Sequence, residues 1–101
     1  MDIKVVTNGS SATILMNGRF DFNAHRPFKD AYDPLLQQKN ITTLEIDLAN
    51  VSYMDSSALG MLLLLRERTE AAGIDVALTK PTNTVAQILD IANFGKVFTI
   101  R

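Results

Sequence analysis

Residues 43–48 read Thr-Leu-Glu-Ile-Asp-Leu, and residues 74–79 read Ile-Asp-Val-Ala-Leu-Thr. In both segments aliphatic residues occupy every second position, which is typical of a strand that is covered on one face and wetter on the other. A helix is predicted between them over residues 57–72, and Gly73 follows it as glycines often follow the end of a helix. Strand, helix and strand of these lengths predict a parallel crossover unit.

A hairpin is predicted before this unit. Residues 3–6 and 12–16 are two short β-rich runs, and Asn8-Gly9 between them tolerates the positive φ angles of a tight turn. The two strands are therefore expected to pair antiparallel. Gly18 is then expected to mark a break in the strand pattern before Arg19-Phe20-Asp21.

Two further helices flank the crossover unit. The first is predicted from Asn23, as its cap, to about Gln38, with an apolar stripe at Phe28, Ala31, Tyr32, Leu35 and Leu36. Pro34 predicts a kink or an early break, because an interior proline costs a helix about 3 kcal/mol. The second helix begins after a cap at Thr82 or Asn83 and ends near Gly95, before a short strand over residues 97–100.

Together these elements predict an α/β fold: a small mixed sheet of four to five strands, with helices packed mainly on one face. The 101 residues, 47% apolar and 21% charged, suit one domain spanning residues 1–101. The net charge of -1 offers no field that would attract nucleic acid. No cysteine and a single histidine exclude thiolate and multi-histidine metal sites.

The expected location is the cytoplasm. The longest apolar run, residues 58–65, is shorter than the roughly 20 residues that span a bilayer. The first residues show no basic region followed by a long apolar stretch, so no secretory signal is expected.

The segment that carries chemistry is Val-Ser-Tyr-Met-Asp-Ser-Ser-Ala-Leu-Gly at residues 51–60, expected to join the end of a strand to the start of a helix. Such a helix start presents free amide hydrogens and a partial positive charge. One interpretation is that Asp55, Ser56 or Ser57 is simply the helix cap. The other is recognition: the first half of the helix is apolar all round, so a deeply packed helix would hold these polar groups as a rigid platform for a partner.

Residues 53–60 resemble the phosphorylation loop of STAS domains, specifically of anti-sigma factor antagonists, and Gly18-Arg19-Phe20-Asp21 is similar to an earlier element of that family. The resemblance implies that Ser56 is phosphorylated and that Ser57 is the neighbouring second hydroxyl. Two acidic positions near the site match Asp21 and Asp55. The remaining residues that it implies for partner binding are Ala58, where many members have glycine, Leu59 and Gly60.

The function that this resemblance implies is partner switching, a form of signal transduction that regulates transcription. The unphosphorylated protein would bind an anti-sigma factor, often a serine/threonine kinase, and so free a sigma factor. Phosphorylation of Ser56 would dissociate the complex, and a PP2C-type phosphatase would reset it. The resemblance implies no cofactor, no direct contact with nucleic acid and no membrane insertion.

The sequence argues against one alternative function and leaves a second one open. A serine hydrolase needs a base beside its nucleophile; His25 is the single histidine and no Gly-x-Ser-x-Gly elbow is present, so no enzyme is predicted. The alternative that stays open is a STAS-domain subunit that docks the ATPase of a membrane transporter, since the same helix serves that purpose in related domains.

Overall fold

Five strands form one sheet in the order β1-β2-β3-β4-β5, accompanied by three α-helices. The structure, a computed structural model, describes all 101 residues. The strands are β1 (Asp2–Asn8), β2 (Ser11–Phe20), β3 (Thr43–Met54), β4 (Asp75–Thr79) and β5 (Thr99–Ile100). The helices are α1 (His25–Leu36), α2 (Ser56–Ala72) and α3 (Asn83–Ile91), with short 3-10 helices η1 (Phe22–Ala24) and η2 (Phe94–Lys96). The predicted α/β fold with a mixed sheet is confirmed.

The sheet is mixed because one pair of strands is antiparallel. β1 and β2 form the predicted hairpin, and Gly9 in its turn has a φ of +62°, which glycine adopts without strain. The other three pairs are parallel, and β3–α2–β4 is the predicted crossover unit. The carboxyl ends of β2 and β3 therefore meet at one edge of the sheet.

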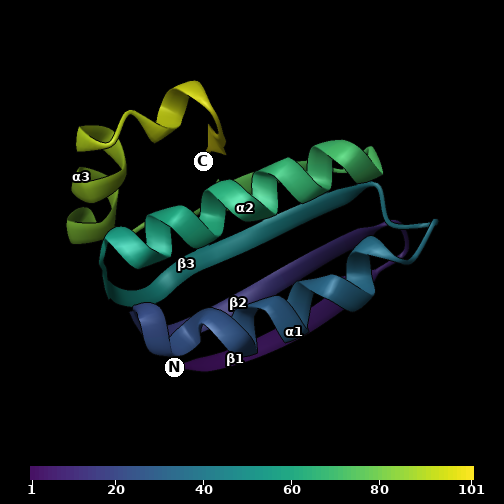
Figure 1. The fold of residues 1–101 in the computed structure, drawn as a ribbon, viewed down its shortest axis with the longest axis horizontal. Coiled ribbons are helices and arrows are strands. Elements are labelled where there is room, and N and C mark those ends of the chain that lie inside the picture. The colour runs from purple at the N-terminus through teal and green to yellow at the C-terminus, as the bar shows by residue number, and fades with distance from the viewer.

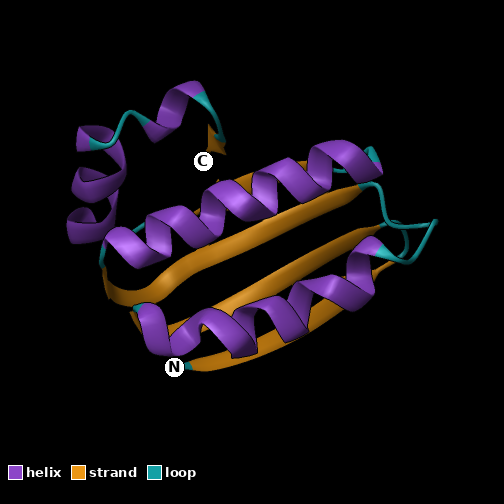
Figure 2. Cartoon of the chain, in the orientation of Figure 1, coloured by secondary structure: helices purple, strands orange, loops and turns teal.

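The helices α1 and α2 lie side by side on one face of the sheet (Figures 1 and 2). Between the helices and the sheet lies the core, in which each fully buried aliphatic side chain contributes about 1.5–3 kcal/mol. Its fully buried strand residues include Ile14, Ile46 and Leu78, and α2 adds Leu62 and Leu65. The third helix, α3, lies beyond the start of α2, at the end of the sheet (Figure 1).

The first helix is shorter than predicted and has a different cap. The Asp21 carboxylate, and not Asn23, provides the cap: it accepts a hydrogen bond of 3.0 Å from the Asn23 amide and starts the turn η1 that leads into α1. Pro34 lies in the last turn of α1, and the helix ends two residues later at Leu36, close to the expected break. The predicted apolar stripe is confirmed, with Phe28, Tyr32 and Leu35 buried.

The third strand is longer than predicted, because β3 continues beyond residue 48 to Met54. β2 also continues past Gly18, which does not end the strand but sits at a shift in register with a φ of +113°. Beyond that bulge β2 and β3 stay paired, with Phe20 opposite Met54. Residues 51–54, predicted as loop, are therefore strand, and Asp55 alone separates β3 from α2.

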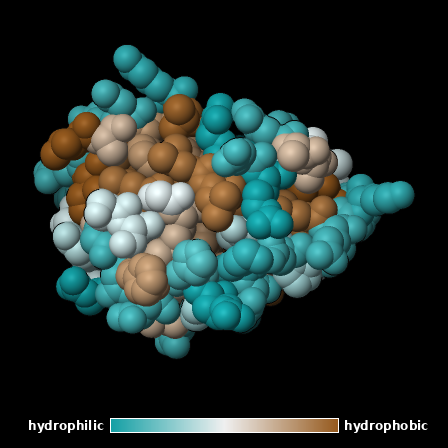
Figure 3. Space-filling view, viewed as in Figure 1, coloured by the Kyte–Doolittle hydropathy of each residue, from teal (hydrophilic) through white to brown (hydrophobic).

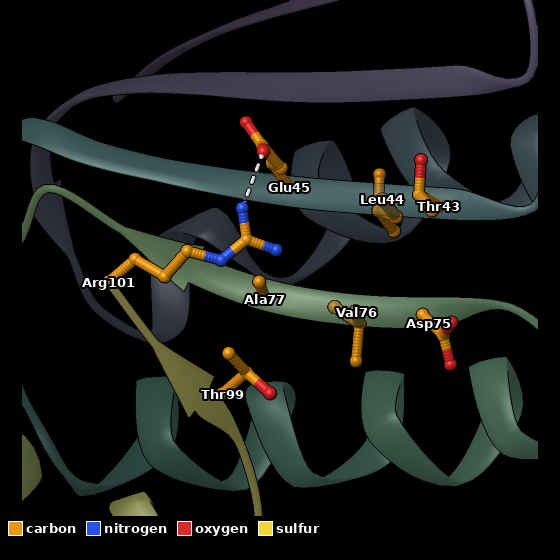
Figure 4. Close-up of a pocket in the computed structure, with 8 residues that line it drawn as sticks. All are labelled: Thr43, Leu44, Glu45, Asp75, Val76, Ala77, Thr99 and Arg101. Atoms are coloured by element: carbon orange, nitrogen blue, oxygen red, sulfur yellow. Dashed lines mark hydrogen bonds and ion pairs between the residues drawn. The ribbon is translucent and has the colours of Figure 1, made fainter.

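The face of the sheet opposite the helices is polar and carries the largest hollow of the structure, about 440 Å³ (Figure 4). Ala77 leaves room there, and Arg101 reaches across β4 to Glu45 at 3.3 Å. The hollow is lined by Thr43 at the start of β3, whereas the predicted site follows the last residue of that strand. The hollow therefore contains none of the predicted site residues.

Candidate functional site

The candidate site lies where β2 and β3 end together. Arg19 is opposite Tyr53 and Phe20 is opposite Met54, and the Asp55 amide donates a 3.3 Å hydrogen bond to the Phe20 carbonyl. This bond joins the residue before Asp21 to the residue before Ser56. The two segments that the sequence analysis singled out, residues 18–21 and 53–60, are thus brought together.

Both carboxylates at this edge are engaged by backbone amides. Asp55 is the N-cap of α2, and its side chain accepts a 3.0 Å hydrogen bond from the Ala58 amide. Asp21 caps η1 in the same way. The capping interpretation of the segment is therefore correct for Asp55, but not for Ser56 or Ser57. A cap of this kind stabilises a helix by about 1 kcal/mol.

The two serines have different surroundings. Ser56 is the first residue of α2 and is exposed, so its hydroxyl is accessible and is not the cap of the helix. Ser57 is half-buried in the wall of a groove of about 280 Å³. The groove runs between η1 and α2, and its other lining residues are Phe22, His25, Gly60, Met61 and Leu64.

The surface around these serines is unusually apolar. Phe22 is 71% exposed, and Leu63 and Leu64 on the outer face of α2 are 45% and 39% exposed. Figure 3 shows hydrophobic side chains gathered on this side of the molecule, over the first half of α2 and over α3, where Ile91 is exposed. The expectation that the first half of α2 is packed on all sides is therefore wrong.

The other predicted binding residues differ in access. Ala58 is 0% exposed, so it supports the site from the core and presents no surface. Leu59 is partly buried against the core. Gly60 is exposed, and a Cβ atom added to it would meet nothing within 4 Å. The accessible part of the predicted set is therefore Ser56, Ser57 and Gly60, together with the partly exposed side chains of Asp21 and Asp55.

Sequence reasoning missed Arg19 and Tyr53 as a pair. The Arg19 guanidinium carbon lies 4.8 Å from the centre of the Tyr53 ring, and its Nε lies 3.9 Å from Asp21 Oδ2. The Arg19 side chain is 65% exposed, so a cation–π contact of about 0.5–1 kcal/mol and a surface ion pair of about 0–1 kcal/mol hold it weakly. No sequence signal could have revealed this pair, because it depends on the shift in register after Gly18.

The single resolved change in acidity lies away from this edge. Burial raises the pKa of the Tyr32 hydroxyl above its ordinary value of 10.0, and the charges of Arg68, Asp33 and Lys29 act on it as well. Tyr32 belongs to the buried stripe of α1, so the raised pKa affects the pH dependence of folding stability. No group of three or more side chains is placed to hold a metal ion, and none of the helices combines the length and hydrophobicity needed to cross a membrane.

Comparison with known proteins places residues 3–100 under a family model described as "Mlab, STAS domain". A STAS-domain-containing protein of Pseudomonas aeruginosa (strain UCBPP-PA14) is 43% identical over 95 residues, which is 92% of this chain and 90% of that protein.

Solved structures share the fold. The anti-sigma factor antagonist SpoIIAA in its unphosphorylated form matches with a TM-score of 0.83 and 21% identity, covering 99% of this chain and 88% of that one. The phosphorylated form of SpoIIAA, from Bacillus, has a TM-score of 0.75 and 20% identity and covers 99% and 91%. A putative anti-sigma factor antagonist from Thermotoga maritima has a TM-score of 0.84 and 19% identity, over 97% and 84%.

Proposed function

Because the chain belongs to the STAS domain family, we propose that it is an anti-sigma factor antagonist controlled at Ser56. With Ser56 unmodified it binds an anti-sigma factor in the cytoplasm, and this frees a sigma factor for transcription. With Ser56 phosphorylated it releases that partner. The fold shared with both forms of SpoIIAA supports this proposal.

The observation that carries the proposal is the exposure of Ser56 at the start of α2. The capping role is taken by Asp55, so a kinase can reach the Ser56 hydroxyl without unfolding the helix. The neighbouring Phe22, Leu63 and Leu64 provide exposed apolar area of the kind that marks a protein interface. A modifiable hydroxyl therefore lies beside a surface suited to a protein partner.

The chain is the substrate of two enzymes in this proposal and catalyses no reaction itself. A serine/threonine kinase, which can be the anti-sigma factor, transfers the γ-phosphoryl group of ATP to Ser56 Oγ, and ADP and the hydroxyl proton leave. A PP2C-type phosphatase then hydrolyses the ester with water and returns the hydroxyl and inorganic phosphate. The chain itself needs no cofactor and contacts no nucleic acid.

Release follows from electrostatics. Phosphorylation adds about -1.5 to -2 charges at pH 7, beside the carboxylates of Asp55 and Asp21. An interface that fits a neutral hydroxyl would have to exclude water from these charges, and like charges brought together across an interface cost several kcal/mol. A loss of 2.7 kcal/mol already lowers affinity about a hundredfold.

The proposal is tested by capture from cell extract followed by calorimetric titration. Immobilised wild-type protein should retain an identifiable anti-sigma factor, Ser56→Ala should bind it within about threefold of wild type, and Ser56→Asp should bind at least tenfold more weakly. Asn83→Asp at the exposed start of α3 places the same charge at another helix N-terminus and is the matched control.

Two results would contradict the proposal. Equal affinity of the Ser56→Ala and Ser56→Asp proteins would remove the charge switch. Capture of a transporter ATPase in place of an anti-sigma factor would instead support the subunit role that the sequence left open.

A further inference from the structure

Arg19 is a cation held at the candidate site by two weak contacts. One is the Tyr53 ring at 4.8 Å, and the other is Asp21 at 3.9 Å. The remaining ion pairs of the chain lie elsewhere: Lys29 and Arg68 with Asp33, Arg66 with Glu70, Lys80 with Asp47, and Arg101 with Glu45. Arg19 is therefore the basic side chain that the pairing of β2 with β3 brings to this edge, where the N-terminal residue Met1 also lies, with its Cα 3.5 Å from the Cβ position of Gly18.

The strand pairing brings Arg19 within reach of Ser56. Arg19 lies directly opposite Tyr53, and Ser56 follows Tyr53 by three residues. β3 ends at Met54 and Asp55 is still extended, so strand spacing and rise put these two Cα atoms no more than roughly 11 Å apart. Arginine has a long side chain, and phosphorylation extends the short side chain of serine by a phosphate group. A guanidinium and a phosphate that point toward each other from Arg19 and Ser56 can therefore meet across this span.

A phosphate on Ser56 would compete successfully for this guanidinium. Arginine binds phosphate through two parallel hydrogen bonds, whereas at Asp21 it has one long contact that water screens. The phosphate would also lie beside Asp21 and Asp55, whose carboxylates already accept hydrogen bonds from backbone amides. A cation is thus needed where three acidic groups gather.

From this geometry we propose that Arg19 is the counter-ion of phosphorylated Ser56. When the phosphate is added, the Arg19 side chain leaves the Tyr53 ring and binds it. The free phosphorylated protein is stabilised, and the face of Tyr53, which is already partly exposed, is uncovered. The inference rests on the proposed function for the phosphate itself, but concerns only contacts within this chain.

The test measures the second pKa of phosphoserine 56 by phosphorus NMR, in protein made with phosphoserine incorporated during translation. A nearby cation favours the dianion, so Arg19 should hold this pKa below the value it would have beside Asp21 and Asp55 alone. In Arg19→Gln we expect it to rise by about half a unit or more, and Arg19→Lys should restore part of the difference.

Two neighbouring variants show whether the effect belongs to Arg19. His25 is the other basic side chain facing this edge, because it lines the groove with Ser57; Arg26 is the next residue of α1 and is exposed. The pKa should change less in His25→Gln and in Arg26→Gln than in Arg19→Gln. An equal or larger change in either variant, or a change below about 0.2 unit in Arg19→Gln, would overturn the proposal.

The Tyr53 ring provides an independent reading. Its proton NMR signals should shift on phosphorylation in the wild type and stay in place in Arg19→Gln, while circular dichroism confirms that both proteins are folded. Unchanged ring signals in the wild type would contradict the movement of Arg19. No partner is present in these measurements, so they can fail while the anti-sigma factor is still captured, and the reverse can also occur.

Discussion

Ser56 and Ser57 are neighbouring hydroxyls that the fold makes unequal. Ser56 is exposed, whereas Ser57 forms part of a groove wall. We therefore predict that Ser56→Ala abolishes phosphorylation by ATP in cell extract and that Ser57→Ala leaves it near the wild-type level. Mass-spectrometric mapping of the modified peptide checks this. Phosphate found on Ser57 in the wild type would show that the wrong hydroxyl had been chosen.

Asp55 stabilises the start of α2 through its hydrogen bond to the Ala58 amide. We predict that Asp55→Ala lowers the free energy of unfolding by about 1 kcal/mol, within the 0.5–2 kcal/mol found for such caps. Asp55→Asn should lose much less, because asparagine caps helices nearly as well. Urea denaturation measures both values, and equal losses in the two variants would mean that the capping bond is not the cause.

At the scale of elements, the sequence predicted the order and type of the strands and helices better than their ends. Alternating aliphatic residues identified the start of β3, but Ala49-Asn50 interrupts the pattern, and β3 continues to Met54 because it stays paired with β2. The exposure of Leu63 and Leu64 was also missed, since a run of leucines does not show which side faces the core.

The candidate site was predictable to the same extent. Asp55 was among the candidate helix caps because a strand end beside a helix start can be recognised locally. The choice of Ser56 as the phosphorylated residue rests on the resemblance of residues 53–60 to the STAS phosphorylation loop, and stays a prediction. The Arg19–Tyr53 contact could not be found in this way, since it requires the register between two strands that are about thirty residues apart in sequence. Pairings of this kind arise from tertiary structure rather than from local pattern.

Gly18 and Gly60 provide a matched pair of variants for these elements. Gly18 sits at the bulge of β2 with a φ of +113°, where a side chain is strained, so Gly18→Ala should lower the free energy of unfolding by about 1–3 kcal/mol. Gly60 lies in α2 with open space around its Cβ position, so Gly60→Ala should raise it by about 0.5–1 kcal/mol. Denaturant unfolding measures both changes. A destabilised Gly60→Ala protein, or an unaffected Gly18→Ala protein, would contradict this account of the backbone.

On the scale of the whole molecule, α1 packs on the rest of the fold through its buried apolar stripe, and its Asp33 forms an ion pair with Arg68 of α2. Tyr32 is buried in that stripe, packs edge-to-face on the ring of Phe28, and is influenced by the charges of the Arg68–Asp33 pair. Arg68 belongs to α2, so the surroundings of Tyr32 join the two helices that cover the sheet. The ionisation of this one hydroxyl therefore bears on the stability of the entire domain.

The stability of the protein should decline at alkaline pH because of Tyr32. Burial raises the pKa of this phenol in the folded state, so between the ordinary pKa of about 10 and the raised value the unfolded chain has lost a proton that the folded chain keeps. The unfolded state then binds fewer protons, and the free energy of unfolding falls as the pH rises. This contribution of Tyr32 is fully present below pH 10 and is lost through the raised pKa. In Tyr32→Phe the slope above pH 10 should be shallower than in the wild type, as measured by urea unfolding at each pH. An identical slope in wild type and Tyr32→Phe would show that other groups cause the alkaline loss.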